Sequence, residues 1–279
     1  HCHEDHIGAV PYVLSELNIP IYAPRLARAL VERRLQEHEL DEKPTFHEMG
    51  AGDTATLGCF QVEFIQVTHS TADCFAIAVR TPLGVVIYTG DFKIDPTPID
   101  NRLFDLHRFA EYGKEGVLLL LSDSTNIEVD GYTPSERTVR PRLEDLLQHS
   151  DGTVFISCFS SSTHRIQQIL DLSLQAGRKV SLIGRSMQTS SEIAHDLGLL
   201  RIPDGLLLRP ADMQRLPRHQ RTVIIAGSQG EPMSSLSRAS VGKHRHAQIQ
   251  EGDQVALSTR MIPGNEKAIF RMIDHIYRR

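Results

Sequence analysis

The chain begins His1-Cys2-His3-Glu4-Asp5-His6, and this stretch decides how the rest of the sequence is interpreted. It holds three imidazoles and two carboxylates within six residues. In a loop or a frayed strand end, alternate side chains point the same way, so His1, His3 and Asp5 are expected to converge on one point and His6 on a second. This mixture of nitrogen and oxygen donors predicts a metal site that suits Zn²⁺, with Mn²⁺ as the alternative.

The composition is that of an ordinary globular protein, with 279 residues, 40% hydrophobic and 23% charged. The longest apolar run, residues 117–121, is too short to span a bilayer, so no membrane association is expected. Four scattered cysteines without a C-x-x-C pair indicate reduced thiols and a cytoplasmic location (Cys2, Cys59, Cys74 and Cys158). Because the chain starts with His and not Met, we expect a processed chain or a fragment.

Charge is distributed unevenly along the chain, whose net charge is −5. Residues 1–150 carry 13 Lys and Arg against 24 Asp and Glu, whereas residues 151–279 carry 17 against 11. The basic second half favours a polyanion as a partner. A solvated surface without any partner explains the same distribution equally well.

The first half of the sequence predicts two helices and a strand, then an antiparallel meander. The helices cover residues 10–17 and 25–40, with a short strand at 20–24 between them. Period-two patterns and Gly-rich turns predict the strands of the meander, at residues 45–49, 54–57, 60–66, 75–80 and 85–89. Residues 117–121 are expected to form a buried strand.

The second half predicts strands that alternate with helices, which is typical of βαβ units and a parallel sheet. The strands are expected at residues 153–158, 180–183, 222–226 and 254–257, and the helices at 163–175, 189–197, 233–238 and 266–277. The fold class is therefore α/β. The change of pattern places a domain boundary near residue 150, giving domains 1–150 and 151–279.

Two further metal-capable residues follow predicted strands, at positions where binding loops usually lie. His69 follows the strand at residues 60–67, and Asp91 follows the strand at 85–89. Each taken alone is most simply a surface His or a turn Asp. Together with the opening stretch they offer His1, His3 and His69 to one ion and Asp5 and His6 to a second, with Asp91 able to bridge. Two ions about 3.5–4 Å apart can activate a hydroxide and hold the oxygens of a phosphoryl displacement.

The opening stretch resembles the H-x-H-x-D-H signature of the metallo-β-lactamase superfamily, and the segments around His69 and Asp91 resemble its later motifs. Further segments are similar to the bacterial ribonuclease J family of β-CASP nucleases. They are Ser122-Asp123-Ser124-Thr125-Asn126, Phe159-Ser160-Ser161-Ser162-Thr163-His164-Arg165, Gly184-Arg185-Ser186-Met187, Gly227-Ser228-Gln229-Gly230-Glu231-Pro232 and Ile262-Pro263-Gly264-Asn265-Glu266. The resemblance covers essentially the whole chain.

The resemblance implies a partial αββα metallo-β-lactamase domain with an inserted, partial β-CASP domain. It also implies a metal-dependent ribonuclease with 5′→3′ exonuclease and endonuclease action in mRNA decay and rRNA maturation. The resemblance further implies two divalent ions as cofactors and RNA with a 5′-monophosphate as the preferred substrate. For the full-length protein it implies a homo-oligomer, either a dimer or a tetramer. Asp5 and Asp123 are assigned catalytic roles on this basis, Asp123 as a residue that orients the metal ligands.

The chain departs from the family in three places. Cys2 stands where Gly is usual, and a thiol there could bind metal or oxidise. The strands that precede the signature are missing. So is the C-terminal part, which in the family carries a Ser-Gly-His motif and a further ligating His. We therefore expect the fragment to bind metal poorly.

The segment from Ser160 to His164 predicts a phosphate-binding site. An apolar strand runs into Ser160, Ser161 and Ser162, and a helix bearing His164 and Arg165 follows. The first turn of a helix offers unpaired N–H groups and a positive dipole end, both of which bind phosphate. Ordinary Ser and Thr capping is the competing interpretation. The family places substrate contacts here, so the resemblance implies that Ser160, Ser161, Ser162 and His164 bind RNA.

Two other functions remain open from the sequence. One is a metallo-β-lactamase-fold hydrolase of small thioesters or lactams, against which the second α/β domain argues. The other is a non-catalytic RNA-binding partner subunit. The full set of candidate ligands argues against a non-catalytic protein, which would have no need of them.

Overall fold

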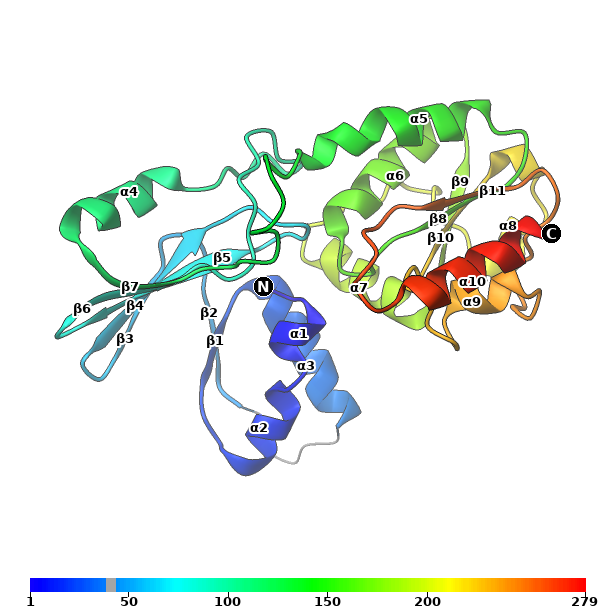
Figure 1. Cartoon of the computed structure of the whole chain (residues 1–279). Helices are drawn as coiled ribbons and strands as arrows, with labels where there is room; N and C mark the ends of the chain where they lie inside the picture. Colours follow the sequence, from blue (N-terminus) through cyan, green and yellow to red (C-terminus); the bar gives the residue numbers. More distant parts are fainter. Residues whose placement is uncertain (39–43) are drawn as a thin grey trace. The chain divides into compact units, whose positions relative to one another are not determined.

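The computed structural model describes residues 1–38 and 44–279. It divides into two compact units, His1–Thr138 and Val139–Arg279, whereas the sequence pattern placed the boundary near residue 150. Figure 1 shows both units. The helix expected at residues 25–40 ends at Glu37, and the predicted end at Leu40 lies outside the described residues.

A five-stranded sheet forms the centre of the first unit. Its order is β3 (Thr54–Leu57), β4 (Phe60–Gln66), β5 (Phe75–Thr81), β6 (Gly84–Tyr88) and β7 (Val117–Leu121). Pairing from β3 to β6 is antiparallel, which confirms the predicted meander for these strands, and β7 runs parallel to β6. The buried side chains of β4, β5 and β6 pack with Tyr112 of helix α4 (Leu106–Glu115) in one apolar cluster.

The strand predicted at residues 45–49 was wrongly assigned to the meander. Its observed core, β2 (Phe46–Glu48), pairs in parallel with β1 (Ile21–Ala23) in a separate two-stranded sheet. The connection between them contains helix α3 (Arg25–Glu37), so the pairing is a β-α-β crossover, which parallel strands require. The short helices α1 (Glu4–Ile7) and α2 (Val10–Glu16) precede β1.

The prediction that β7 is a buried strand was also wrong. The side chains of Leu118, Leu119, Leu120 and Leu121 are between 48% and 60% exposed. β7 is the terminal strand of its sheet, and among the described residues only β6 pairs with it. Apolar composition therefore identified a strand correctly but could not show whether another layer covers it.

Helix α4 was not predicted, and a polar network attaches it to the sheet. Arg108 donates from Nε and Nη2 to the two carboxylate oxygens of Glu63 on β4, each at 2.7 Å. The Tyr112 hydroxyl donates to the same carboxylate at 2.5 Å, and these bonds hold the pKa of Glu63 below its usual value. Asp105 caps the helix by accepting from the Arg108 amide.

The second unit is a four-stranded parallel sheet with the order β11-β8-β10-β9, which confirms the predicted βαβ pattern. Helices connect the strands (Figure 1). The 3₁₀ helix η1 (Glu136–Val139) contains the boundary between the two units. In chain order the elements of the second unit are then α5 (Arg140–His149), β8 (Val154–Ser157), α6 (Thr163–Gln175), β9 (Lys179–Ile183), α7 (Arg185–Asp196), α8 (Pro210–Met213), η2 (Arg218–Gln220), β10 (Arg221–Ile225), α9 (Ser235–Ser240), β11 (Gln254–Leu257) and α10 (Glu266–Tyr277).

A buried arginine fixes the amino-terminal edge of this sheet. Arg178, 3% exposed, donates to the backbone carbonyl oxygens of Leu147, Ser150, Gly152 and Arg221. These oxygens belong to the end of α5, the turn before β8 and the start of β10, so one side chain joins three segments. Burial lowers the pKa of this guanidinium, which nevertheless remains charged at neutral pH.

Within the part of the chain that the structure describes, no helix combines the length and the apolar character that a membrane span requires.

Candidate functional site

The candidate metal ligands of the first unit come from three separate segments. His1 and His3 precede helix α1, and His6 lies on it. His69 follows β4, and Asp91 follows β6. An isolated antiparallel bridge between Thr68 and Lys93 joins the last two segments, so the residues on either side of it are held next to each other.

Four of these residues bring one ligand atom each to a common point. His3 Nδ1 lies 3.1 Å from His1 Nε2 and 3.2 Å from His69 Nε2. Asp91 Oδ2 lies 3.6 Å from His1 Nε2 and 3.8 Å from His69 Nε2. The four ligand atoms all lie within 4.8 Å of one another. Three imidazoles and one carboxylate in this arrangement match the ligand types and number that Zn²⁺ takes in proteins.

A second group shares Asp91 with the first. His6 Nε2 lies 3.3 Å from Asp91 Oδ1 and 3.7 Å from Asp5 Oδ2. The two oxygens of Asp91 therefore face different groups, Oδ2 toward His1 and His69 and Oδ1 toward His6. A carboxylate placed in this way can bridge two cations.

The expected convergence of His1, His3 and Asp5 was wrong. It assumed an extended chain, but helix α1 begins at Glu4, so the alternation of side chains ends after His3. Asp5 instead groups with His6, as the assignment to a second ion required. Its side chain is 76% exposed, which makes it the most solvated of the six candidate ligands.

Burial sets the charge of the first group. It lowers the pKa of His3 to about 4 and that of His69 to about 3, so both imidazoles are neutral at pH 7 and keep a lone pair. Burial also raises the pKa of Asp91, with the nearby carboxylates of Asp123 and Asp5 adding to the rise and His6 opposing it. Neutral imidazole nitrogens have lone pairs that can bind a cation. The negative charge of the Asp91 carboxylate is unfavourable in these surroundings, and a bound cation would stabilise it.

Asp123 contacts the backbone next to this cluster, at Phe92. Burial alone would raise its pKa, but hydrogen bonds from Thr125 and from the Phe92 amide outweigh it, and the pKa is lowered. Its Oδ1 accepts from the Thr125 amide at 2.8 Å and the Thr125 hydroxyl at 2.6 Å, and its Oδ2 accepts from the Phe92 amide at 3.4 Å. Because Phe92 follows Asp91 directly, this geometry is consistent with an orienting role for Asp123.

Two residues beside His69 contribute to the site and were not singled out from the sequence. The Ser70 hydroxyl lies 3.5 Å from His3 Nε2. The Thr68 hydroxyl donates to the Lys93 carbonyl and accepts from the Asp95 amide at 3.2 Å. Hydroxyls on either side of a histidine carry no sequence signal of their own, because the fold determines their hydrogen-bond partners.

The predicted phosphate-binding residues gather at the end of β8 in the second unit. Ser160 and Ser161 are half-buried, whereas Ser162 and His164 are buried, and α6 begins at Thr163. Ser162 occupies the N-cap position of α6, yet its side chain makes no capping hydrogen bond to the helix. The simplest competing interpretation, a capping serine, therefore does not hold for Ser162.

Loops after neighbouring strands support this segment. Arg165 donates from Nη1 to the carbonyl and hydroxyl oxygens of Ser258, directly after β11, at 2.9 and 2.5 Å. Gln229, after β10, is buried and bonds the Arg260 carbonyl at 3.0 Å and the Ile262 amide at 2.9 Å. The carboxyl ends of parallel strands thus meet at one edge, where α/β sheets usually bind ligands.

Sequence comparisons identify both halves of the chain. Residues 1–134 match the model of the metallo-beta-lactamase superfamily, and residues 151–276 match that of the ribonuclease J beta-CASP domain. The chain is 45% identical to ribonuclease J of Synechocystis sp. over 278 residues, covering 99% of this chain and 43% of that protein. It is 43% identical to ribonuclease J of Mycobacterium tuberculosis over 275 residues, covering 98% and 49%.

These relatives are longer than the chain, which spans less than half of their length. Among solved structures, the chain is similar to a protein of unknown function from Enterococcus faecalis V583, with a TM-score of 0.60 at 13% identity. That match covers 98% of this chain and 72% of the other. At this low identity the likeness shows a shared fold.

Proposed function

The chain belongs to the ribonuclease J family of the metallo-β-lactamase superfamily, and on that premise we propose that it provides the metal site of an RNA-hydrolysing enzyme. The reaction is metal-dependent hydrolysis of RNA phosphodiesters by 5′→3′ exonuclease and endonuclease action, in mRNA decay and rRNA maturation. Its cofactors are two divalent ions, Zn²⁺ before Mn²⁺.

The observation that carries this proposal is the division of the Asp91 carboxylate between two groups of ligands. One oxygen lies 3.6 and 3.8 Å from His1 and His69, and the other lies 3.3 Å from His6. A structural metal site would need only one closed set of ligands. Two adjacent sets that share a carboxylate are typical of two-metal phosphodiester hydrolysis.

When bound, the two ions would supply an activated water and stabilise negative charge on the phosphate oxygens. His1, His3, His69 and Asp91 would hold one ion, and Asp5, His6 and Asp91 the other. The exposed Asp5 carboxylate, at the solvent side of its group, is also positioned to accept a proton from water. Asp123 keeps the Asp91 loop in place through the Phe92 amide.

Substrate binding falls to the second unit in this proposal. The amides that begin α6, with Ser160, Ser161, Ser162 and His164, would bind the 5′-monophosphate of RNA. The basic composition of residues 151–279 favours a polyanion here. We further propose a cytoplasmic protein that forms a homo-oligomer, dimer or tetramer, at full length.

The test uses the protein extended to the length of its relatives, with Zn²⁺ or Mn²⁺ added. It is offered 5′-monophosphorylated RNA and, separately, a chromogenic lactam. We expect RNA to be shortened to mononucleotides and the lactam to be left intact. His3→Ala should abolish the cleavage, whereas the control His107→Ala should not, because His107 is an exposed residue of α4.

Three outcomes would contradict the proposal. Lactam turnover without RNA loss would indicate a hydrolase of small substrates. RNA binding without cleavage would indicate a non-catalytic partner subunit. For the substrate segment, Ser161→Ala should reduce the preference for monophosphate over hydroxyl 5′ ends, and an unchanged preference would remove that assignment.

A further inference from the structure

The chain leaves the first unit through a segment that is bonded to the loop after Asp91. The first unit ends at Thr138, within the 3₁₀ helix η1 that begins at Glu136. Residues 134–137 of this segment contact residues 93–101, which follow Asp91 in the chain. These contacts form an anchor, whose residues are Lys93, Asp95, Thr97, Ser135, Glu136 and Arg137.

A buried ion cluster forms the first part of the anchor. Lys93 Nζ lies 3.5 Å from Glu136 Oε2 and 3.6 Å from Asp95 Oδ2, and the three side chains are 12%, 9% and 1% exposed. The Asp95 carboxylate also accepts from the Glu136 amide and the Thr97 amide, each at 2.9 Å. Burial by itself would raise the pKa of Asp95, but these hydrogen bonds outweigh it and the pKa is lowered. Separating the cluster would leave buried charges uncompensated, so this part holds the two segments together.

Arg137 forms the second part of the anchor. Its Nε donates to the Thr97 carbonyl at 2.8 Å, and its Nη2 donates to the Pro98 carbonyl at 3.2 Å and to Asn101 Oδ1 at 3.1 Å. The Thr97 hydroxyl also donates to the Ser135 hydroxyl at 2.9 Å. One exposed guanidinium thus joins the last residues of the first unit to three residues of the neighbouring loop.

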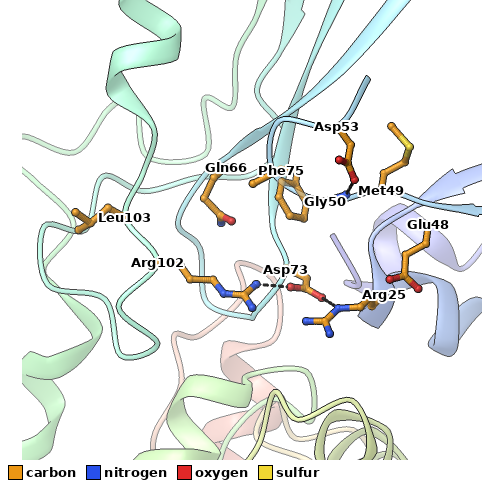
Figure 2. A pocket seen from close by; sticks show the side chains of 11 residues that line it. Arg25, Glu48, Met49, Gly50, Asp53, Gln66, Asp73, Phe75, Arg102 and Leu103 are labelled. Atoms are coloured by element: carbon orange, nitrogen blue, oxygen red, sulfur yellow. Dashed lines mark hydrogen bonds and ion pairs between the residues drawn. The ribbon is translucent and has the colours of Figure 1, made fainter. Parts of the chain in front are cut away.

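The loop of residues 93–101 is fixed at both ends to the segment that carries His69. At its start, the Thr68 hydroxyl and carbonyl bond to its backbone. At its end, Arg102 Nη1 donates at 2.7 Å to Oδ1 of Asp73, and Figure 2 shows these two side chains together. Asp73 is buried and follows His69 by four residues. The exit of the chain from the first unit is therefore hydrogen-bonded, through this loop, to the segments that carry the candidate metal ligands.

We propose that the anchor sets the register in which RNA is cut, so that Lys93, Asp95 and Arg137 are positioning residues for the reaction. The proposal rests on the function proposed above, in which the second unit binds the RNA and the first unit holds the metal ions. The described chain joins the two units between Thr138 and Val139. A rigid exit from the first unit keeps the bound 5′-phosphate at one distance from the metal ions, and each cut then falls at the same phosphodiester.

A loosened anchor would let the strand slip past the metal ions. Successive phosphates are at least about 3.4 Å apart along a strand, so a movement of that order brings the next phosphodiester to the metal ions. Smaller movements lower the rate, since a misplacement of about 1 Å can cost about 100-fold. The signature of a loosened anchor is therefore slower cleavage with products longer than one nucleotide. A loss of stability alone would reduce the amount of active enzyme and leave mononucleotides as the product.

The lengths of the products test this distinction. The protein extended to the length of its relatives is loaded with Zn²⁺ and given 5′-monophosphorylated RNA. Arg137→Gln removes three hydrogen bonds of an exposed side chain, and the control Arg142→Gln makes the same change on α5, where Arg142 is 91% exposed and lies 3.9 Å from Asp145. We expect dinucleotides and trinucleotides from Arg137→Gln, and mononucleotides alone from the control and the wild type. Lys93→Met, which breaks the buried cluster, should shift the product lengths in the same direction.

A distance measurement is independent of activity. Nitroxide labels are placed at Lys114→Cys on α4 and Glu192→Cys on α7, with Cys59→Ser to remove an exposed thiol. Double electron–electron resonance on the metal-free protein then gives the distribution of distances between the two units. We expect a broader distribution in Arg137→Gln and the wild-type distribution in Arg142→Gln.

Several results would overturn the proposal. If the wild type cuts RNA and Arg137→Gln still releases mononucleotides alone, at whatever rate, the anchor has only a structural role and the proposed function stands. An unchanged distance distribution in Arg137→Gln has the same consequence. A loss of Zn²⁺ affinity in Arg137→Gln, measured by competition with a chelating indicator, would place the effect at the metal ligands instead. If the wild type cuts no RNA, the proposed function fails and the register fails with it.

Discussion

Thr68→Val tests how the fold holds His69 beside Asp91. The Thr68 hydroxyl donates to the Lys93 carbonyl and accepts from the Asp95 amide, and the Thr68 carbonyl accepts from the Lys93 amide at 2.8 Å. Thr68 and Asp95 are 6% and 2% exposed, so water does not replace a lost partner. Valine keeps the shape and the β-branch of threonine and removes only the hydroxyl.

The expected cost follows from the two groups that the substitution leaves unpaired. A buried donor or acceptor without a partner costs about 1–3 kcal/mol, so with two such groups the free energy of unfolding of the first unit should fall by about 2–6 kcal/mol. Thr68→Ser keeps the hydroxyl and loses one methyl group, which is worth about 0.8 kcal/mol. Urea unfolding measures both variants, and a slope of about 2 kcal/mol/M converts the loss expected for Thr68→Val into a midpoint shift of about 1–3 M.

Metal affinity provides a second measurement that a loss of stability alone would not explain. Substitution of groups that orient metal ligands typically lowers affinity about 10- to 100-fold. We expect that range for Zn²⁺ binding to folded Thr68→Val, measured by competition with a chelating indicator, and near-wild-type affinity for Thr68→Ser. The reasoning is refuted if Thr68→Val unfolds within about 0.5 kcal/mol of the wild type, or if serine is as damaging as valine.

Three further predictions concern stability and metal content. Arg178→Met should lower the free energy of unfolding by about 3 kcal/mol in thermal or urea unfolding, because four carbonyl groups lose their donor, two of them in buried hydrogen bonds and two in partly buried ones. The metal-free protein should be most stable above pH 6.5 and lose stability as the pH falls toward 4, since folding lowers the pKa of His3 to about 4 and of His69 to about 3. Unfolding midpoints across this range should flatten in His69→Gln, and an unchanged profile would contradict the assignment. Asp91→Asn should lose both metal ions by elemental analysis, whereas Asp5→Asn should lose one, and equal losses would argue against a shared carboxylate.

The elements with a strong local pattern were predictable from the sequence. Strand β3 and helices α6 and α10 begin and end at the predicted residues, because turn glycines or polar loops flank clear periodic segments. The errors concern partners distant in sequence. Nothing local indicates that residues 46–48 pair with β1, or that the leucines of β7 lack a covering layer. Apolar composition reports a tendency to be buried and does not identify the element that would bury it.

The candidate site shows the same division between residue type and geometry. The residue types predicted which side chains lie together, since a combination of imidazoles and carboxylates at strand ends is typical of a metal site. How these side chains group depends on whether a helix begins at Glu4. Because the single turn of α1 begins there, Asp5 lies with His6 and Asp91 and not with His1 and His3. Thr68, by contrast, acts through hydrogen bonds to Lys93 and Asp95, which are 25 and 27 residues away, and no spacing rule predicts such contacts.

Burial disfavours the charged forms of His3, His69 and Asp91, and this links the stability of the fold to metal binding. Burial is the largest of the effects that drive His3 and His69 toward the neutral form and raise the pKa of Asp91. At neutral pH the folded protein therefore presents bare imidazole lone pairs around a carboxylate that lacks a strong positive partner. Cations reverse this balance, because they stabilise the Asp91 carboxylate and use the lone pairs that protons would otherwise occupy. The acid sensitivity predicted for the metal-free fold and the metal binding proposed for it thus share their largest physical cause, the exclusion of water from the ligands.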